Sequence, residues 1–339
     1  MKFTLPRKYR IPALIAIVLL FSAPPLIFEL FLNTASGNGR NIQILELDKG
    51  ASLKKFATLL EERRIIRSAG LFVLYARLRG DDSRVKAGYY QVNDAMAPVE
   101  ILRRMVAGEV YELRCAVPEG YSIYQVAELL AGRHLFDKDT FLKECFNGPL
   151  LKELGIAGKS AEGYLYPCTY DITPNMTPTD LIRLMVGQFH KVNNRDLAVR
   201  VKGVRLSKRD IITLASMVEK EAVKPEEKPL IASVFFNRLA LRMPLQSDPT
   251  AVYGVRAFAG NVSKQDITRP TPYNTYLIRG LPPGPIGNPG RGAIEAVLRP
   301  ASTCYFYFVA KRDGTHYFST SLQEHNQAVR TYLKTVSHN

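Results

Sequence analysis

The sequence predicts an α+β protein with an N-terminal membrane helix, a region of repeated strand–helix units and a larger, mostly helical domain with short strands. Three observations indicate this: an uncharged apolar run near the N-terminus, a strand–helix pattern that occurs twice, and helical periodicity in much of the chain after residue 155. The 339 residues are enough for two or three domains with proper cores. A hydrophobic content of 46% and a charged content of 23% are ordinary for a folded protein.

The N-terminal residues predict a membrane anchor. Residues 1–10 carry four basic residues and no acid, and residues 11–28 contain no charged residue. As a helix, this apolar run would span about 27 Å, close to the ~30 Å of a hydrocarbon core. A cleaved signal peptide is the alternative, but its apolar core is normally about 7–15 residues long. We therefore expect a cytoplasmic tail at 1–10, a single-pass transmembrane helix at 11–32 and a polar linker at 33–40, with the rest of the chain across the membrane.

Composition and cysteine spacing narrow the classes of function. Lys and Arg number 46 against 31 Asp and Glu, and the net charge of +15 favours an anionic partner such as nucleic acid, acidic lipid or an anionic polymer. The expected export argues against nucleic acid. The sequence has no C-x-x-C or H-E-x-x-H motif and no tight Cys/His cluster, so we predict neither a metal site nor a cofactor. In an exported chain the cysteines could form one or two disulfides or remain isolated thiols; they are Cys115, Cys145, Cys168 and Cys304.

A strand–turn–helix pattern occurs twice at an offset of 70 residues. ELDKGASLKKFATLLEERRII begins at Glu46, and AVPEGYSIYQVAELLAGRHLF begins at Ala116. Each copy reads as a strand, a glycine turn, a serine N-cap and an amphipathic helix. The identical positions are Gly50/Gly120, Ser52/Ser122, Ala57/Ala127, Leu59/Leu129, Leu60/Leu130 and Arg63/Arg133. Short units of this kind are common in glycan-binding modules of the LysM type, so we expect a LysM-like region at 41–155. A packing unit without a ligand is the alternative.

The chain beyond this region is assigned to one domain at 156–339. Over the whole chain, the predicted helices cover 68–79, 98–107, 138–146, 178–201, 207–222, 226–241 and 322–336, and the further predicted strands cover 85–92, 304–310 and 316–319. Asp313-Gly314 lies between the last two strands and is a signal for a hairpin turn.

The segment LSKRDIITLASMVEKEA, which begins at Leu206, predicts an amphipathic helix with an acid at the edge of its apolar face. Ser207 and Asp210 fit a capping box at its start. Apolar residues from Ile211 onward share one face, and Glu219 lies about 80° from Ile211 around the helix. A carboxyl group at such a border is partly desolvated, which favours the protonated form that a general acid needs. A solvated glutamate at a charged helix end is the alternative.

Other segments carry candidate substrate contacts. In AEGYLYPCTYDI, which begins at Ala161, Glu162 and every second residue to Tyr170 would share one face of an extended chain, and tyrosine rings suit sugar faces. A buried aromatic face is the alternative. Eight of the eleven residues from Gly280 to Gly290 are Pro or Gly, which predicts a rigid loop at the wall of a groove. Asp248 before Pro249 is also an expected helix N-cap. The candidate contacts are Glu162, Tyr166, Asn237, Gln246, Asp248, Tyr253, Asn274 and Tyr276.

Several long segments resemble those of a known family. They are EGYLYPCTY (162–170), ASMVEKEA (215–222), VFFNRL (234–239), MPLQSDPTAVYG (243–254), PYNTYLIRGLPPGPIGNPG (272–290) and DGTHYFS with EHN (313–326). In this order they resemble the YceG-like, MltG-type endolytic murein transglycosylases, over most of the chain. In that family the catalytic glutamate is the first acid of A-S-x-V-E-K-E, which is Glu219 here. The family pattern E-G-Y-L-x-P-D-T-Y has Asp where this chain has Cys168, so a role of that acid does not carry over, whereas the assignment of Glu219 is unaffected.

The resemblance implies a lyase of the bacterial inner membrane that cleaves the β-1,4 bond between N-acetylmuramic acid and N-acetylglucosamine within peptidoglycan strands. It implies 1,6-anhydro-muramyl ends, termination of nascent strands and peptidoglycan synthases as partners. Glu219 would protonate the leaving oxygen and then take the proton from the muramyl O6. Glu221 lies about 200° away around the helix, so it is not the second carboxyl group that a hydrolase normally needs. A single acid favours the internal attack, unless Glu162 or Asp248 folds in beside Glu219. A non-catalytic, membrane-tethered peptidoglycan-binding or scaffold protein is the alternative.

Overall fold

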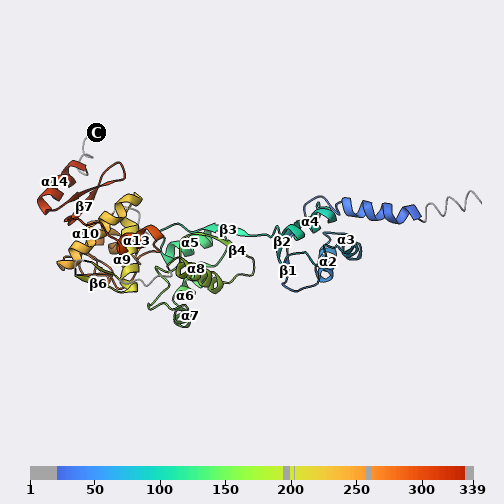
Figure 1. Cartoon of the computed structure of the whole chain (residues 1–339), viewed down its shortest axis with the longest axis horizontal. Coiled ribbons are helices and arrows are strands. Elements are labelled where there is room, and N and C mark those ends of the chain that lie inside the picture. Colours follow the sequence, from blue (N-terminus) through green and yellow to red (C-terminus); the bar gives the residue numbers. More distant parts are fainter. Residues whose placement is uncertain (1–20, 194–198, 202, 257–261, 333–339) are drawn as a thin grey trace, which may run out of the picture. The chain divides into compact units, whose positions relative to one another are not determined.

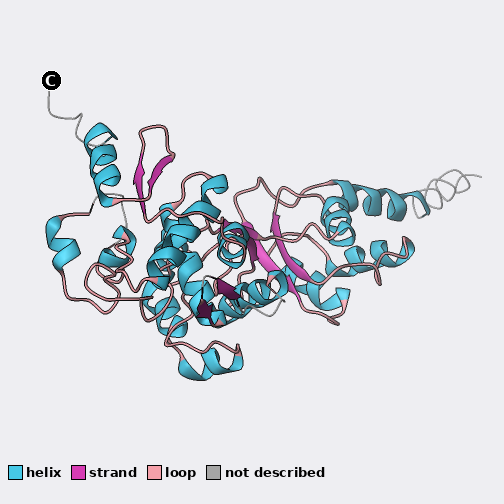
Figure 2. Cartoon of the chain, turned by 60° about the vertical axis from the view of Figure 1, so that its left-hand side comes forward, coloured by secondary structure: helices cyan, strands magenta, loops and turns pink. Residues whose placement is uncertain are grey.

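The computed structural model describes residues 21–193, 199–201, 203–256 and 262–332, and the chain divides into two compact units between Leu113 and Arg114 (Figure 1). Helices are the main regular secondary structure of both units, and the described strands form four separate two-stranded sheets (Figure 2). Each unit has its own buried core. This division differs from the boundary expected near residue 155, because Val126 and Leu130 are buried in the same core as the second half of the chain.

The N-terminal unit is built on one antiparallel strand pair and three helices. β1 (Ile42–Leu47) pairs with β2 (Gly88–Asn93), with Leu45 opposite Tyr90. The helices are α2 (Leu53–Glu62), α3 (Ala69–Leu78) and α4 (Pro98–Ala107). A helical segment that reaches residue 33 also contributes Phe31 and Leu32 to this core.

The membrane helix expected at 11–32 lies largely outside the described residues. Among the residues that are described, none of the helices combines the length and the apolar character needed to cross a bilayer.

The repeated strand–helix unit is confirmed at the level of the backbone. The second copy consists of β3 (Leu113–Ala116) and α5 (Ile123–Gly132). Gly50 and Gly120 both have positive φ angles, of 85° and 76°, as glycine turns require. Ser52 and Ser122 both cap the following helix by accepting a backbone N–H bond. The copies differ in context, because β1 pairs with β2 in one unit and β3 pairs with β4 (Thr169–Ile172) in the other.

The C-terminal unit is organised around α9 (Lys208–Glu221). Three helices pack against it: α10 (Lys228–Ala240), α11 (Asp248–Val252) and α13 (Arg291–Leu298). The eight residues from Ile211 to Val218 are all buried. The predicted capping box of Ser207 and Asp210 is confirmed. The predicted amphipathic pattern is wrong for this stretch, because neighbouring elements cover the helix on every side.

The other elements of the C-terminal unit, in chain order, are α6 (Lys138–Cys145), α7 (Gly148–Glu153), α8 (Pro178–Val192), β5 (Val199–Val201), β6 (Val204–Leu206), η1 (Pro225–Glu227), α12 (Lys264–Thr268), β7 (Tyr307–Ala310), β8 (His316–Ser319) and α14 (Leu322–Tyr332).

Three local predictions need correction. The helix expected at 178–201 ends at Val192, and residues 199–201 form β5 instead. Residues 161–168 form turns rather than an extended strand, so the alternating residues do not share a face; Tyr164 and Tyr170 are buried, as in the alternative interpretation. Asp248 is the first residue of α11, and the N-cap is the preceding serine.

The predicted hairpin and last helix are confirmed where the structure describes them. β7 and β8 are antiparallel, with Ala310 opposite His316, and Gly314 in the turn has a φ of 77°. All four cysteines are free thiols.

The two cores predict separate effects of matched core substitutions. Leu60 and Leu130 occupy equivalent repeat positions and are 0% and 1% exposed. Each change to alanine should cost about 2–5 kcal/mol, because it leaves a cavity. We expect Leu60→Ala to lower only the unfolding temperature of the N-terminal unit, and Leu130→Ala only that of the C-terminal unit, in calorimetry of the whole chain. Equal shifts of every transition by both variants would contradict the division.

Candidate active site

Glu219 lies in the last turn of α9, and two donors hold its carboxylate. Its side chain is 7% exposed. The Lys228 ammonium group donates to Oε1 at 2.7 Å, and the Gly290 N–H donates to Oε2 at 3.0 Å. The partial burial expected at this position is therefore present. The surroundings are not apolar, however, because an ammonium group and a backbone N–H both stabilise a negative charge.

Lys228 is a functional candidate that sequence reasoning missed. It is the first residue of α10, and the chain turns back through η1 so that its side chain meets Glu219, nine residues earlier. The ammonium group also lies 3.5 Å from the carboxylate of Glu119, whose side chain is 53% exposed. Lys228 itself is only 8% exposed. The sequence feature that could have indicated Lys228 is a lysine at the start of a largely apolar helix. Such a lysine is expected to be buried, and buried lysines are rare unless they are paired.

The turn at Gly120 is bonded to the Pro/Gly-rich loop that carries Gly290. The Gly120 N–H donates to the Asn288 carbonyl at 2.8 Å, and the Asn288 N–H donates to the Tyr121 carbonyl at 2.9 Å. A Cβ atom on Gly290 would lie 1.9 Å from a carboxylate oxygen of Glu119, so a larger residue there would displace the Glu119 carboxylate. The loop and the second repeat copy are thus held together beside Glu219.

Glu162 and Asn288 form a buried hub behind this turn. The Asn288 side chain accepts the Leu165 N–H at 2.9 Å and donates to Glu162 at 3.3 Å. Glu162 is 2% exposed and also accepts the Ile123 N–H at 3.1 Å and the Tyr253 hydroxyl at 2.8 Å. The hub therefore connects the start of α5, the loop and the residue after α11. These contacts make Glu162 an internal anchor rather than a sugar contact.

Glu162 and Glu221 have raised pKa values. Burial raises the pKa of Glu162 to about 7, against the opposing effect of the Tyr253 and Ile123 hydrogen bonds. Burial likewise raises the pKa of Glu221 to about 7, although the Ser247 hydroxyl donates to it at 2.6 Å. The Ser247 contact is separate from the two donors that hold Glu219, in agreement with the predicted angle around the helix.

Other predicted contacts hold the fold together. Asn237 is 4% exposed and donates to the carbonyls of Thr303 and Tyr305. Gln246 accepts a hydrogen bond from the Arg238 guanidinium group at 3.1 Å. The Tyr276 hydroxyl donates to Asp248. We therefore do not retain Asn237 as a sugar contact, and Gln246, Asp248 and Tyr276 have partners within the protein.

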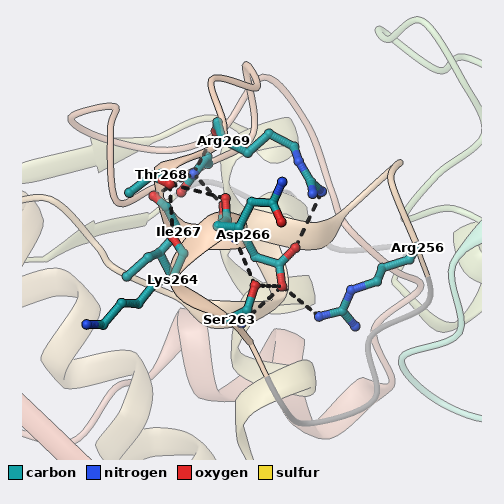
Figure 3. A network of polar contacts seen from close by, with 9 residues as sticks. Arg256, Ser263, Lys264, Asp266, Ile267, Thr268 and Arg269 are labelled. Carbon is teal, nitrogen blue, oxygen red and sulfur yellow. Dashed lines mark hydrogen bonds and ion pairs between the residues drawn. The ribbon is translucent and has the colours of Figure 1, made fainter.

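Asn274 also has a structural role. It is fully buried, and its side-chain amide donates to the carbonyls of Asp266 and Arg269 at 3.3 and 2.9 Å. The Asp266 carboxylate bonds Ser263, Arg256 and Arg269, and Figure 3 shows this polar network around α12. Asn274 thus ties its own segment to α12, which explains an amide in that motif without a ligand.

A cavity of about 190 Å³ lies beside the second repeat copy and α9. Tyr124, Lys220 and Tyr253 are among its lining residues, so the predicted contact Tyr253 borders this cavity. Tyr166 is half-buried. Burial is the main cause that raises its pKa, and the negative charge of Glu119 is the second. Within the described ranges, no group of three or more His, Cys, Asp or Glu side chains is arranged to hold a metal ion.

Comparisons with known proteins agree on one family. The profile of the YceG-like family matches residues 45–331. A curated endolytic murein transglycosylase of Bacillus subtilis (strain 168) is 33% identical over 85% of this chain and 84% of its own length. One from Streptococcus pneumoniae serotype 2 is 29% identical over 87% of this chain and 59% of its own length. A crystal structure of a yceG-like protein from Listeria monocytogenes has a TM-score of 0.57 and 30% identity, and it covers 85% of this chain and 99% of that one.

The raised pKa of Glu162 predicts that stability falls as pH rises. The folded state keeps this proton up to about pH 7, whereas the unfolded chain releases it near the model-peptide pKa of 4.5. Between these values the folded state binds more protons, so rising pH lowers the free energy of unfolding, by about 3 kcal/mol from this group. Chemical denaturation at several pH values should show this slope, and Glu162→Gln should reduce it.

A residual slope of the same sign from Glu221 is expected in that variant. An unchanged slope in Glu162→Gln would contradict the assignment.

Proposed function

The chain belongs to the YceG-like family, and on this premise we propose that it is an endolytic peptidoglycan transglycosylase with Glu219 as its catalytic acid and base. Its substrate would be the β-1,4 bond between N-acetylmuramic acid and N-acetylglucosamine within a glycan strand. The observation that carries this proposal is the nearly buried Glu219 carboxylate, held by Lys228 and by the Gly290 N–H.

Glu219 would act twice in one turnover. First its protonated form gives its proton to the leaving O4 oxygen while the bond from O4 to the muramyl C1 breaks. Then its carboxylate takes the proton of the muramyl O6 while O6 bonds to C1, which closes a 1,6-anhydro ring. The enzyme ends with the protons it began with, and no water enters. Between the two steps Glu219 is ionised, and the Lys228 ammonium and Gly290 N–H stabilise that form.

Two features of the sequence support a membrane setting. The uncharged run at 11–28 and the basic residues before it are typical of a single-pass anchor with its N-terminus in the cytoplasm. We propose that the catalytic unit acts on the outer face of the bacterial inner membrane. There it would cut nascent strands, end their elongation and lie near peptidoglycan synthases. LysM-like glycan contact by the two strand–helix units is part of this proposal.

We predict that Glu219→Gln abolishes cutting of purified sacculi while the protein stays folded. Loss of the acid and base should lower the rate by at least about 100-fold. Release of soluble glycan fragments is the measurement, and thermal unfolding reports the fold. Glu226→Gln is the matched control, because Glu226 is exposed and lies in the next segment. A Glu219→Gln variant as active as the wild type would refute the assignment and favour a binding or scaffold protein.

The products distinguish internal attack from hydrolysis. We expect mass spectrometry of digested sacculi to find 1,6-anhydro-muramyl ends, because O6 replaces water at C1. A product with reducing muramyl ends would identify a hydrolase instead.

Lys228→Met should slow the cutting of sacculi. The variant loses the ammonium group that stabilises the ionised Glu219 between the two steps. The maximal rate should fall by about 100-fold, since one preorganised contact is lost. Rates on purified sacculi test this, with Lys224→Met as the control. A rate equal to that of the wild type would show that Lys228 does not act on Glu219.

A further inference from the structure

A second carboxylate lies beside Glu219 at the same lysine. The Lys228 nitrogen is 2.7 Å from Glu219 Oε1 and 3.5 Å from Glu119 Oε2. These two oxygens are therefore no more than about 6 Å apart, which does not exceed the separation of up to about 10 Å between paired carboxyl groups in glycosidases. Sequence reasoning considered Glu162, Asp248 and Glu221 for this place, and the contacts of all three lie with other protein groups.

The two carboxylates differ in access. The side chain of Glu219 is 7% exposed, whereas that of Glu119 is 53% exposed. A strand that reached Glu219 could therefore meet Glu119 without prior rearrangement of buried groups.

The backbone holds Glu119 in place. It precedes Gly120, whose N–H is bonded to Asn288, and its carboxylate lies over Gly290. The Gly290 N–H donates to Glu219, so both carboxylates lie next to the same residue of the loop. A side chain on such a turn has its Cα position set before substrate arrives, which is what a preorganised charge requires.

The charges of this group suit a cationic centre. Two carboxylates and one ammonium group leave one negative charge when both acids are ionised. Cleavage of a glycosidic bond develops positive charge at C1 and its ring oxygen. The positive charge on the sugar is greatest after Glu219 has lost its proton. At that point the Lys228 ammonium group is paired with the Glu219 carboxylate. Glu119 is then the accessible anion.

We propose that Glu119 is a second catalytic residue, whose carboxylate faces the muramyl C1 and stabilises the oxocarbenium-like transition state. The inference rests on the proposed function. Glu119 forms no bond and moves no proton in this step: the bond from C1 to O4 breaks, O6 bonds to C1, and Glu219 carries the proton.

Glu119→Gln tests the inference, since it removes the charge and keeps the shape. We expect kcat on sacculi to fall by about 10- to 100-fold with KM little changed, because charge stabilisation acts in the transition state. Glu119→Asp should retain more activity than Glu119→Gln. Glu153→Gln is the matched control: Glu153 is 54% exposed, lies in the same compact unit but outside the repeat copy, and also pairs with a basic side chain. It should leave kcat unchanged.

A binding measurement separates this role from a structural one. The probes are a muramyl iminosugar with a protonated nitrogen at the anomeric position and its neutral lactam counterpart. Glu119→Gln should weaken binding of the cationic probe about tenfold in calorimetry and leave the neutral probe unchanged. Equal weakening of both probes, or an unchanged kcat, would overturn the inference. A wild-type protein that binds strands and cuts none would refute the proposed function instead.

Discussion

The contact between the Glu219 carboxylate, the Lys228 ammonium group and the Gly290 N–H is the constraint on which the catalytic unit depends. It joins the end of α9, the start of α10 and the N-terminal end of α13, which are separate in sequence. A nearly buried carboxylate is costly without such partners. The packing of α10 and α13 against α9 brings the partners into reach.

The second repeat copy supplies the other half of the site. Its turn at Gly120 bonds the Pro/Gly-rich loop, and the buried Glu162 and Asn288 hold that arrangement from behind. The first copy has the same turn and N-cap but lies in the other compact unit. The same strand–turn–helix pattern therefore has two roles. In the N-terminal unit it packs a small core, and in the C-terminal unit it positions Glu119 and the Pro/Gly-rich loop.

Local signals in the sequence were sufficient for much of the fold, and they singled out Glu219 as the candidate acid. The Ser207 capping box, the repeat, α4, and the hairpin at Asp313-Gly314 follow from short-range preferences. Glu219 followed from helix periodicity and resemblance. Lys228 and Glu119 could not be predicted, because their role comes from the tertiary approach of three segments. For the same reason Asn237 and Asn274 looked like ligand contacts, although both bind backbone carbonyls.

The most direct test is a crystal structure of the Glu219→Gln protein with a bound glycan strand. The account predicts that the oxygen of one internal glycosidic bond lies within hydrogen-bond distance, about 3 Å, of the residue 219 amide, with the Glu119 carboxylate facing the muramyl C1 of that bond. A strand bound elsewhere, with every glycosidic oxygen far from residue 219, would contradict it.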